Sequence, residues 1–92
     1  MYNKYAELRR RYLRTHKSGI YTGMLLTDKL DAHLKVIGAA VLEMLDRLIE
    51  QMKVAEGVTE QLKAENQMEW VGRMNNIQSR AEEIVLSELI YN

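Results

Sequence analysis

The sequence contains no cysteine and no proline. Without cysteine the chain can form neither disulfides nor thiolate metal sites, which suits a reducing compartment, so we expect a cytoplasmic protein. Without proline, no helix has to be interrupted by a pyrrolidine ring. Long apolar runs are also missing, because the longest, residues 36–42, contains Gly38 and stops at Glu43. We therefore expect no segment that spans a membrane and no contact with one, and the polar N-terminus indicates no secretory signal.

Charge is balanced over the 92 residues, with 13 basic and 13 acidic side chains, but its distribution is uneven. Residues 1–20 hold six basic side chains against the single acid Glu7, a net charge of +5, which leaves −5 for residues 21–92. This asymmetry permits two interpretations. The basic segment is an arm that contacts nucleic acid, or it is a helix that lies on the acidic remainder of its own chain. The candidate nucleic-acid contacts are Arg9, Arg10, Arg11, Arg14 and Lys17.

Apolar residues recur at steps of three and four in three stretches, which predicts an all-α fold in a single domain, residues 1–92. The first helix is expected at about 3–17, with Asn3 as its N-cap and Gly19 as a left-handed stop. A short connection, residues 20–23, follows it. Further along, Tyr91 closes an apolar C-terminal end, which indicates that the terminus is docked, with Tyr5 and Tyr12 as candidate receiving surfaces.

Two long helices are expected at about 28–55 and 60–90. Thr27 is a candidate N-cap for the first of them. Gly57 can take a left-handed backbone between them, and Thr59 can cap the second. A connection this short forces an antiparallel hairpin.

The expected hairpin register places Met44 at the level of Trp70. The apolar faces of both long helices are wider than a hairpin and one short helix can cover, so the sequence predicts a dimeric helical bundle, a homodimer. Gly38 is expected to allow close packing of a neighbour, whereas Gly72 and Asn76 receive no role. The candidate core or interface residues are Trp70, Met44, Met74, Ile77 and Asn75.

Residue patterns that would support catalysis or metal binding are weak. The two histidines, His16 and His33, are not part of a Glu-x-x-His or His-Glu-x-x-His pattern, so no metal site is expected. No glycine-rich phosphate loop occurs, and no cofactor is expected. The paired acids Glu65 and Glu69 are typical of a solvated helix surface. No enzyme class is therefore supported, and we expect a non-enzymatic protein.

Several stretches of the chain together carry a family resemblance. Residues 57–71 read GVTEQLKAENQMEWV, residues 73–77 read RMNNI and residues 81–91 read AEEIVLSELIY. Together with YAELRRRYL at 5–13, and with Tyr21, Leu25, Leu26, Lys29 and Leu30, these residues resemble the TnpV family of small transposon-encoded proteins. The resemblance covers nearly the whole chain. It implies a mobile-element setting and an accessory part in transposition or excision, and it implies no chemistry.

Two functions follow from these observations and stay open at this stage. The first is an accessory protein that contacts DNA through the basic first helix, with phosphate contacts that give affinity and little sequence preference. The second is a structural dimer that binds another protein, such as a recombinase of the element, without touching DNA.

Overall fold

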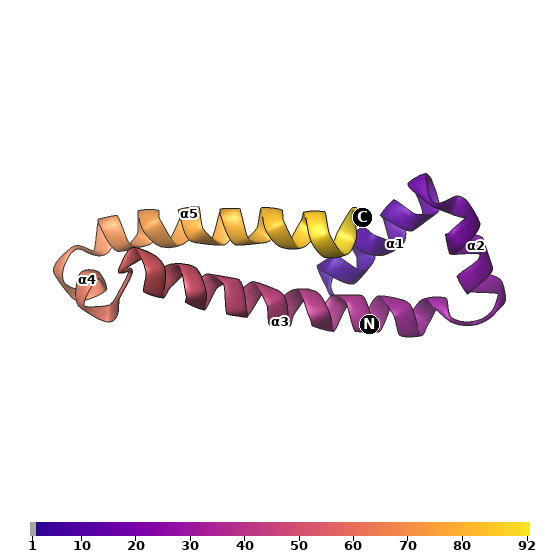
Figure 1. The fold of residues 1–92 in the computed structure, drawn as a ribbon, viewed down its shortest axis with the longest axis horizontal. Coiled ribbons are helices and arrows are strands. Elements are labelled where there is room, and N and C mark those ends of the chain that lie inside the picture. Colours follow the sequence, from indigo (N-terminus) through magenta and orange to yellow (C-terminus); the bar gives the residue numbers. More distant parts are fainter. Residues whose placement is uncertain (1) are drawn as a thin grey trace.

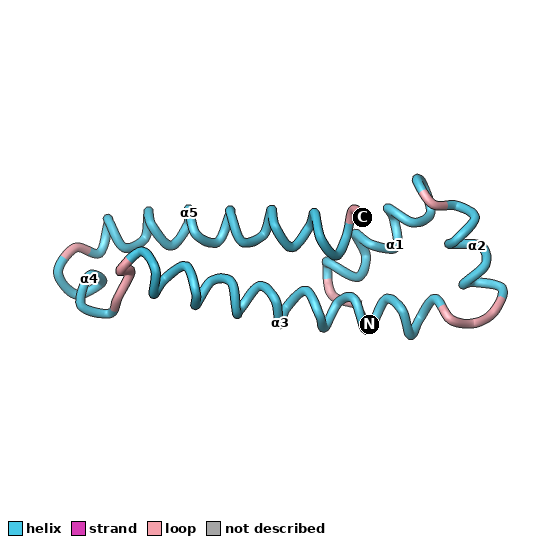
Figure 2. Tube along the Cα trace, viewed as in Figure 1, coloured by secondary structure: helices cyan, strands magenta, loops and turns pink. Residues whose placement is uncertain are grey.

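The computed structural model describes residues 2–92, and within this range the chain is helical, as predicted. Figures 1 and 2 show the helices joined by short turns. The elements in chain order are α1 (Lys4–His16), α2 (Ser18–Leu26), α3 (Leu30–Glu56), α4 (Glu60–Glu65), α5 (Gln67–Val85) and a final π-helical turn, η1 (Leu86–Ile90).

The molecule is a rod rather than a globule. Its Cα atoms span 56 × 20 × 20 Å, with a radius of gyration of 16.9 Å. A compact domain of this length has a radius of gyration of about 12 Å. The long helices α3 and α5 lie side by side, α4 folds across one end of the rod, and α1 and α2 close the other end (Figure 1).

The start of α1 agrees with the sequence, but its end does not. Asn3 is the N-cap, and its Oδ1 accepts a hydrogen bond from the Ala6 backbone N–H at 2.9 Å. The prediction that Gly19 stops this helix is wrong, because α1 ends at His16 and Gly19 lies inside α2. Lys17, with φ −135°, makes the break. Packing explains α2, since Tyr21 and Met24 lie against a buried cluster of α1 and α3.

The junction before α3 also differs from the expectation. Thr27 does not cap α3, because its hydroxyl donates to the Gly23 carbonyl at 2.8 Å and so belongs to the end of α2. Asp28 follows with φ +59°, a left-handed backbone that a short polar side chain tolerates. As a result α3 begins at Leu30, two residues after the predicted start.

The turn after α3 combines two confirmed features with one error. Gly57 has φ +67°, and Thr59 accepts a hydrogen bond from the Leu62 N–H at 3.2 Å, both as predicted. The uninterrupted helix predicted at 60–90 is wrong, because Asn66 separates α4 from α5. Asn66 Oδ1 accepts from the Glu69 N–H at 3.2 Å. Asparagine is a poor residue inside a helix and a good one at its N-cap, which explains the break.

The break at Asn66 changes the pairing of the long helices. With α4 folded across the end of the rod, α5 begins later than expected relative to α3 (Figure 1). Val41 therefore shares a buried cluster with Val85, whereas the predicted register placed the nearby Met44 at the level of Trp70. That register is wrong.

Two buried clusters lie at the end of the rod that contains α1. The first comprises Tyr5, Val41, Val85 and Ile90, and the second comprises Ala6, Leu13, Leu30 and Leu34. Beyond α1 the rod is two helices thick. Within 44–56 of α3 and 67–77 of α5, Ile77 alone is fully buried, and the other apolar side chains of this section are half-buried or exposed. Beyond the coverage of α1 the core is thus sparse, with Ile77 of α5 and Val58 of the turn before α4 as its buried side chains.

Candidate functional site

The basic residues of the first helix have different environments, although the sequence places them together. Arg9 is half-buried and holds the C-terminal end of the chain. Its Nη1 donates to the Ile90 carbonyl at 2.8 Å and to Asn92 Oδ1 at 2.7 Å, and its Nε donates to His33 Nε2 at 3.4 Å. Arg9 is therefore not available for a phosphate in this conformation.

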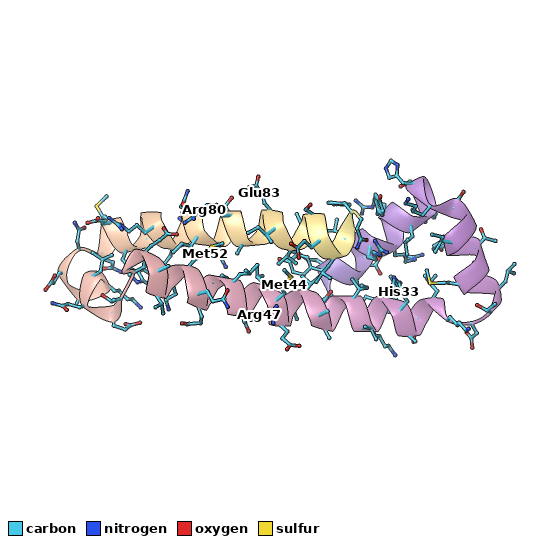
Figure 3. All side chains as sticks on the ribbon, viewed as in Figure 1. His33, Met44, Arg47, Met52, Arg80 and Glu83 are labelled. Atoms are coloured by element: carbon cyan, nitrogen blue, oxygen red, sulfur yellow. The ribbon has the colours of Figure 1, made fainter. Side chains whose placement is uncertain are left out.

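These contacts shift two pKa values. Partial burial lowers the pKa of Arg9 below its ordinary value. Partial burial and the neighbouring Arg9 guanidinium both lower the pKa of His33. Because His33 accepts the Arg9 hydrogen bond at Nε2, the imidazole must be neutral for the contact to form. The neutral form of His33 thus accompanies its contact with Arg9, the residue that holds the C-terminal end. His33 lies on the part of α3 nearest α1 and α2 (Figure 3).

The C-terminal end is docked, as the sequence indicated. Tyr91 meets the ring of Tyr12 edge-on, with ring centroids 5.4 Å apart. The wider π-helical turn lets the Tyr91 N–H reach the Leu86 carbonyl at 2.8 Å. Ile90 is fully buried beside Tyr5. The C-terminal end therefore packs on α1, and each of these two segments stabilises the position of the other.

Two further cations of the first segment are paired with acids. Arg10 lies 3.2 Å from a carboxylate oxygen of Glu7, one turn away on α1. Hydrogen bonds with the Tyr21 hydroxyl and with Glu7 raise the pKa of Arg10. Lys4 approaches Glu82 of α5 at 4.0 Å. Both pairs are largely exposed, so each contributes little stability, and Arg10 is only partly available to an outside anion.

Arg11, Arg14 and Lys17 remain as the accessible part of the basic segment. All three are exposed, and no ion pair within residues 2–92 involves any of them. Arg11 and Arg14 are three residues apart, about 60° around the helix, so they share one face of α1. Of the five predicted contact residues, the structure leaves these three as a solvent-facing cationic patch, which we call the α1 patch.

The predicted core or interface residues also separate. Ile77 is fully buried, Met44 and Met74 are half-buried, and Asn75 is exposed. Trp70 is half-buried, with the Lys63 ammonium 4.7 Å from its ring centroid. The Asn66 break places it in the first turns of α5, next to α4.

A polar network on the long helices was not predicted. Arg80 of α5 reaches Glu56, the last residue of α3, at 2.7 Å, and Arg73 donates to the Glu56 carbonyl at 3.5 Å. Asn76 Oδ1 accepts from Arg80 Nε at 2.8 Å. The pairing of Glu56 depends on the register of α3 and α5, which depends on Asn66, so no local pattern could reveal it. For Arg9 a local signal existed, since it follows the buried Tyr5 by four residues and shares its face.

Metal-binding and membrane-spanning features have no support in the part of the chain that the structure describes. No group of three or more histidine, cysteine, aspartate or glutamate side chains there is arranged to hold a metal ion. No helix in residues 2–92 combines the length and apolar character that crossing a membrane requires. The candidate sites are therefore surfaces: the α1 patch and the thin section of α3 and α5.

Comparison with known proteins adds the family. Neither the curated proteins nor the solved structures that were searched gave a match to this chain. The family model described as transposon-encoded protein TnpV matches residues 1–90 of the 92, which is nearly the whole length and includes α1, the long helices and Ile90. The chain belongs to the TnpV family of transposon-encoded proteins.

Proposed function

We propose that this protein is a non-enzymatic accessory protein of a transposon or another mobile element, and that it contacts DNA weakly through the α1 patch. Membership in a transposon-encoded family supports the setting. The observation that carries the DNA contact is the exposure of Arg11, Arg14 and Lys17 without an ion pair on the described chain. Cations that are not paired within the protein are the ones that can neutralise phosphates.

The expected affinity is low for a physical reason. The remainder of the chain carries a net −5, which opposes approach to a polyanion, and at physiological salt screening is strong beyond about 8–10 Å. Three phosphate contacts release few counterions, so we expect binding at about micromolar concentration or weaker, with little sequence preference.

An electrophoretic shift at low and at physiological salt tests this function. Arg11→Gln combined with Arg14→Gln should abolish the shift, because glutamine removes the charge and keeps helix propensity. Arg47→Gln combined with Lys63→Gln is the matched control, since it removes two exposed charges on α3 and α4, outside the α1 patch. Equal loss in both double variants would mean that general charge, and not the α1 patch, attracts DNA. No shift by the wild type at low salt would contradict the DNA contact.

A second candidate function is a self-associating module, in which α3 and α5 form an antiparallel hairpin that pairs with a second copy and then binds a protein of the element, such as its recombinase. The supporting observation is the thin section of the rod, where Met44, Met74 and Trp70 are half-buried. When another helix layer covers partly exposed apolar side chains, the burial of their surface is stabilising.

Light scattering across micromolar concentrations tests the self-association. The expected mass is twice the 10.7 kDa of the chain. A single-chain mass at every concentration would contradict it. Because this measurement involves no nucleic acid, its outcome is independent of the DNA test.

A further inference from the structure

The first residues of the chain identify one side of the α3–α5 pair. Asn3 Nδ2 donates to the Gly38 carbonyl of α3 at 3.1 Å, and the next residue, Lys4, approaches Glu82 of α5 at 4.0 Å. Since neighbouring residues contact both helices, Gly38 and Glu82 must lie on the same side of the pair. Positions on each helix can then be assigned to that side from the 100° turn per residue.

Steps of three and four from these two residues trace a strip along the thin section. On α3 they lead from Gly38 to Leu42, Leu45 and Ile49, and on α5 they lead back from Glu82 to Gln78, Asn75 and Val71. All six positions lie within about 40° of their starting residue. We call this strip the Leu42–Val71 face.

The Leu42–Val71 face joins four apolar side chains with the two amides Asn75 and Gln78, none of them charged, and it is largely open. Leu42 is 48% exposed and Val71 is 42% exposed, although both belong to long helices. Two shallow hollows border it where it meets charged neighbours. One, of about 360 Å³, is lined by Asn75 and Gln78 with the acids Glu82 and Glu83, and the other, of about 290 Å³, is lined in part by Leu42 and Lys35. Hollows of this kind can receive side chains from a facing helix.

The opposite side of the pair has a different character. Arg80 and Arg73 lie about 160–180° around α5 from Glu82, and both bind Glu56 of α3 there. Guanidinium groups thus cross from α5 to α3 on that side and keep it polar. Burying them would carry a large desolvation cost, so the Leu42–Val71 face is the one suited to a partner.

The accessible surface of the chain exceeds that of a compact monomer by about the area that one partner buries in a stable dimer. The accessible surface is 6245 Å². A compact monomer of 10.7 kDa has about 5,500 Å², so the rod exposes about 700 Å² more than its mass requires. One partner of a standard stable interface buries about 800 Å². The excess is therefore close to what one subunit covers in a stable dimer.

We propose that a second copy of this chain docks on the Leu42–Val71 face, with the same face of both copies in contact across a two-fold axis. This proposal rests on the self-associating function proposed above and specifies its interface. In a two-fold interface each patch meets itself, so a charged strip would repel its copy, whereas these six residues carry no charge. The two amide side chains, Asn75 and Gln78, hydrogen-bond across the interface and select one register.

Two exposed valines provide a matched test. Val71 lies on the face, whereas Val54 lies 16 residues after Gly38, about 160° around α3, and is 80% exposed. In light scattering, Val71→Lys should halve the mass at a concentration where the wild type is a dimer, and Val54→Lys should leave the mass unchanged. Far-UV circular dichroism and thermal melting show whether each variant is folded.

The absence of cysteine permits a second measurement that requires no disruption. Val71→Cys and Val54→Cys each introduce the single thiol of the chain. Alkylation of the residue 71 thiol by N-ethylmaleimide should slow as the protein concentration rises through dimer formation, while the residue 54 thiol should react at a constant rate. A wild-type dimer in which the residue 71 thiol stays reactive at all concentrations would overturn the face and leave the dimer intact. A monomeric wild type would overturn the self-association itself.

Discussion

The side chain of Asn3 lies directly against the backbone of Gly38. A Cβ atom at residue 38 would meet Asn3 Oδ1 at 3.0 Å, and Asn3 Nδ2 donates to the Gly38 carbonyl at 3.1 Å. The same amide also caps α1 through Ala6. One side chain thus starts the first helix and holds it on the third, and the absence of a side chain at Gly38 makes room for it.

Gly38→Ala should therefore be unfavourable, although alanine is the better helix residue. Helix propensity alone gives alanine about 1 kcal/mol over glycine. Gly72, which has open space around its Cα, should gain this amount on replacement by alanine. At Gly38 the new methyl displaces Asn3 and weakens a cap worth about 1 kcal/mol. In thermal unfolding, Gly72→Ala should melt at a higher temperature than the wild type, and Gly38→Ala should be no more stable than the wild type. An equal gain in stability in both variants would show that Asn3 moves freely.

Arg9→Gln should cost about 2 kcal/mol of unfolding free energy, because charge-assisted hydrogen bonds to the C-terminal residues are lost. Arg14→Gln, on an exposed residue of the same helix, should change stability by less than about 0.5 kcal/mol. Urea unfolding measures both. Similar effects of the two substitutions would contradict the assignment of Arg9 to the docked end.

Acid should weaken the docked end through His33. Its pKa is lowered in the folded chain by burial and by Arg9, so the unfolded state binds the proton more readily. The stability from neutral His33 is fully present above the ordinary pKa of 6.5 and is lost as the pH falls below it toward the folded-state pKa.

His33→Gln should remove this part of the pH dependence, and His16→Gln should retain it, because His16 is exposed and outside the Arg9 contact. Thermal melting between pH 5 and pH 8 compares the two variants. The remaining titratable groups bind about the same number of protons in both, so a difference between their pH profiles comes from the substituted histidine. An unchanged pH profile in His33→Gln would contradict the role of His33.

Trp70→Ala should destabilise the chain by about 2 kcal/mol, less than the roughly 3–5 kcal/mol of a fully buried aromatic side chain. The reason is that Trp70 is half-buried and contacts the Lys63 ammonium. The native fluorescence maximum should lie between those of buried and solvent-exposed tryptophan. A fully blue-shifted maximum in a monomeric sample would contradict the half-buried position.

Local signals in the sequence were sufficient for the helical class and for several helix ends. Asn3, Gly57 and Thr59 act where they were predicted, because a cap or a left-handed turn is decided by one residue and its immediate neighbours. The docked C-terminus also followed from a local pattern, the apolar end near Tyr91.

The errors concern choices that depend on tertiary contacts. Gly19 can end a helix or lie within one, and the packing of Tyr21 on the α1–α3 cluster decides for the helix. Asn66 can lie inside a helix or cap one, and only the fold shows that it caps α5. The register of α3 and α5 follows from Asn66, so a single ambiguous residue accounts both for the missed break and for the wrong register.

The contact between Arg9 and Ile90 joins residues 81 positions apart, which has a consequence for synthesis on the ribosome. The cluster of Ala6, Leu13, Leu30 and Leu34 can form as soon as the first part of α3 has emerged. The cluster of Tyr5, Val41, Val85 and Ile90 must wait for the last turn of the chain. The side of α1 that carries Tyr5 thus stays without its C-terminal partners throughout translation, and the final step of folding is the arrival of the C-terminal turn on a helix made first.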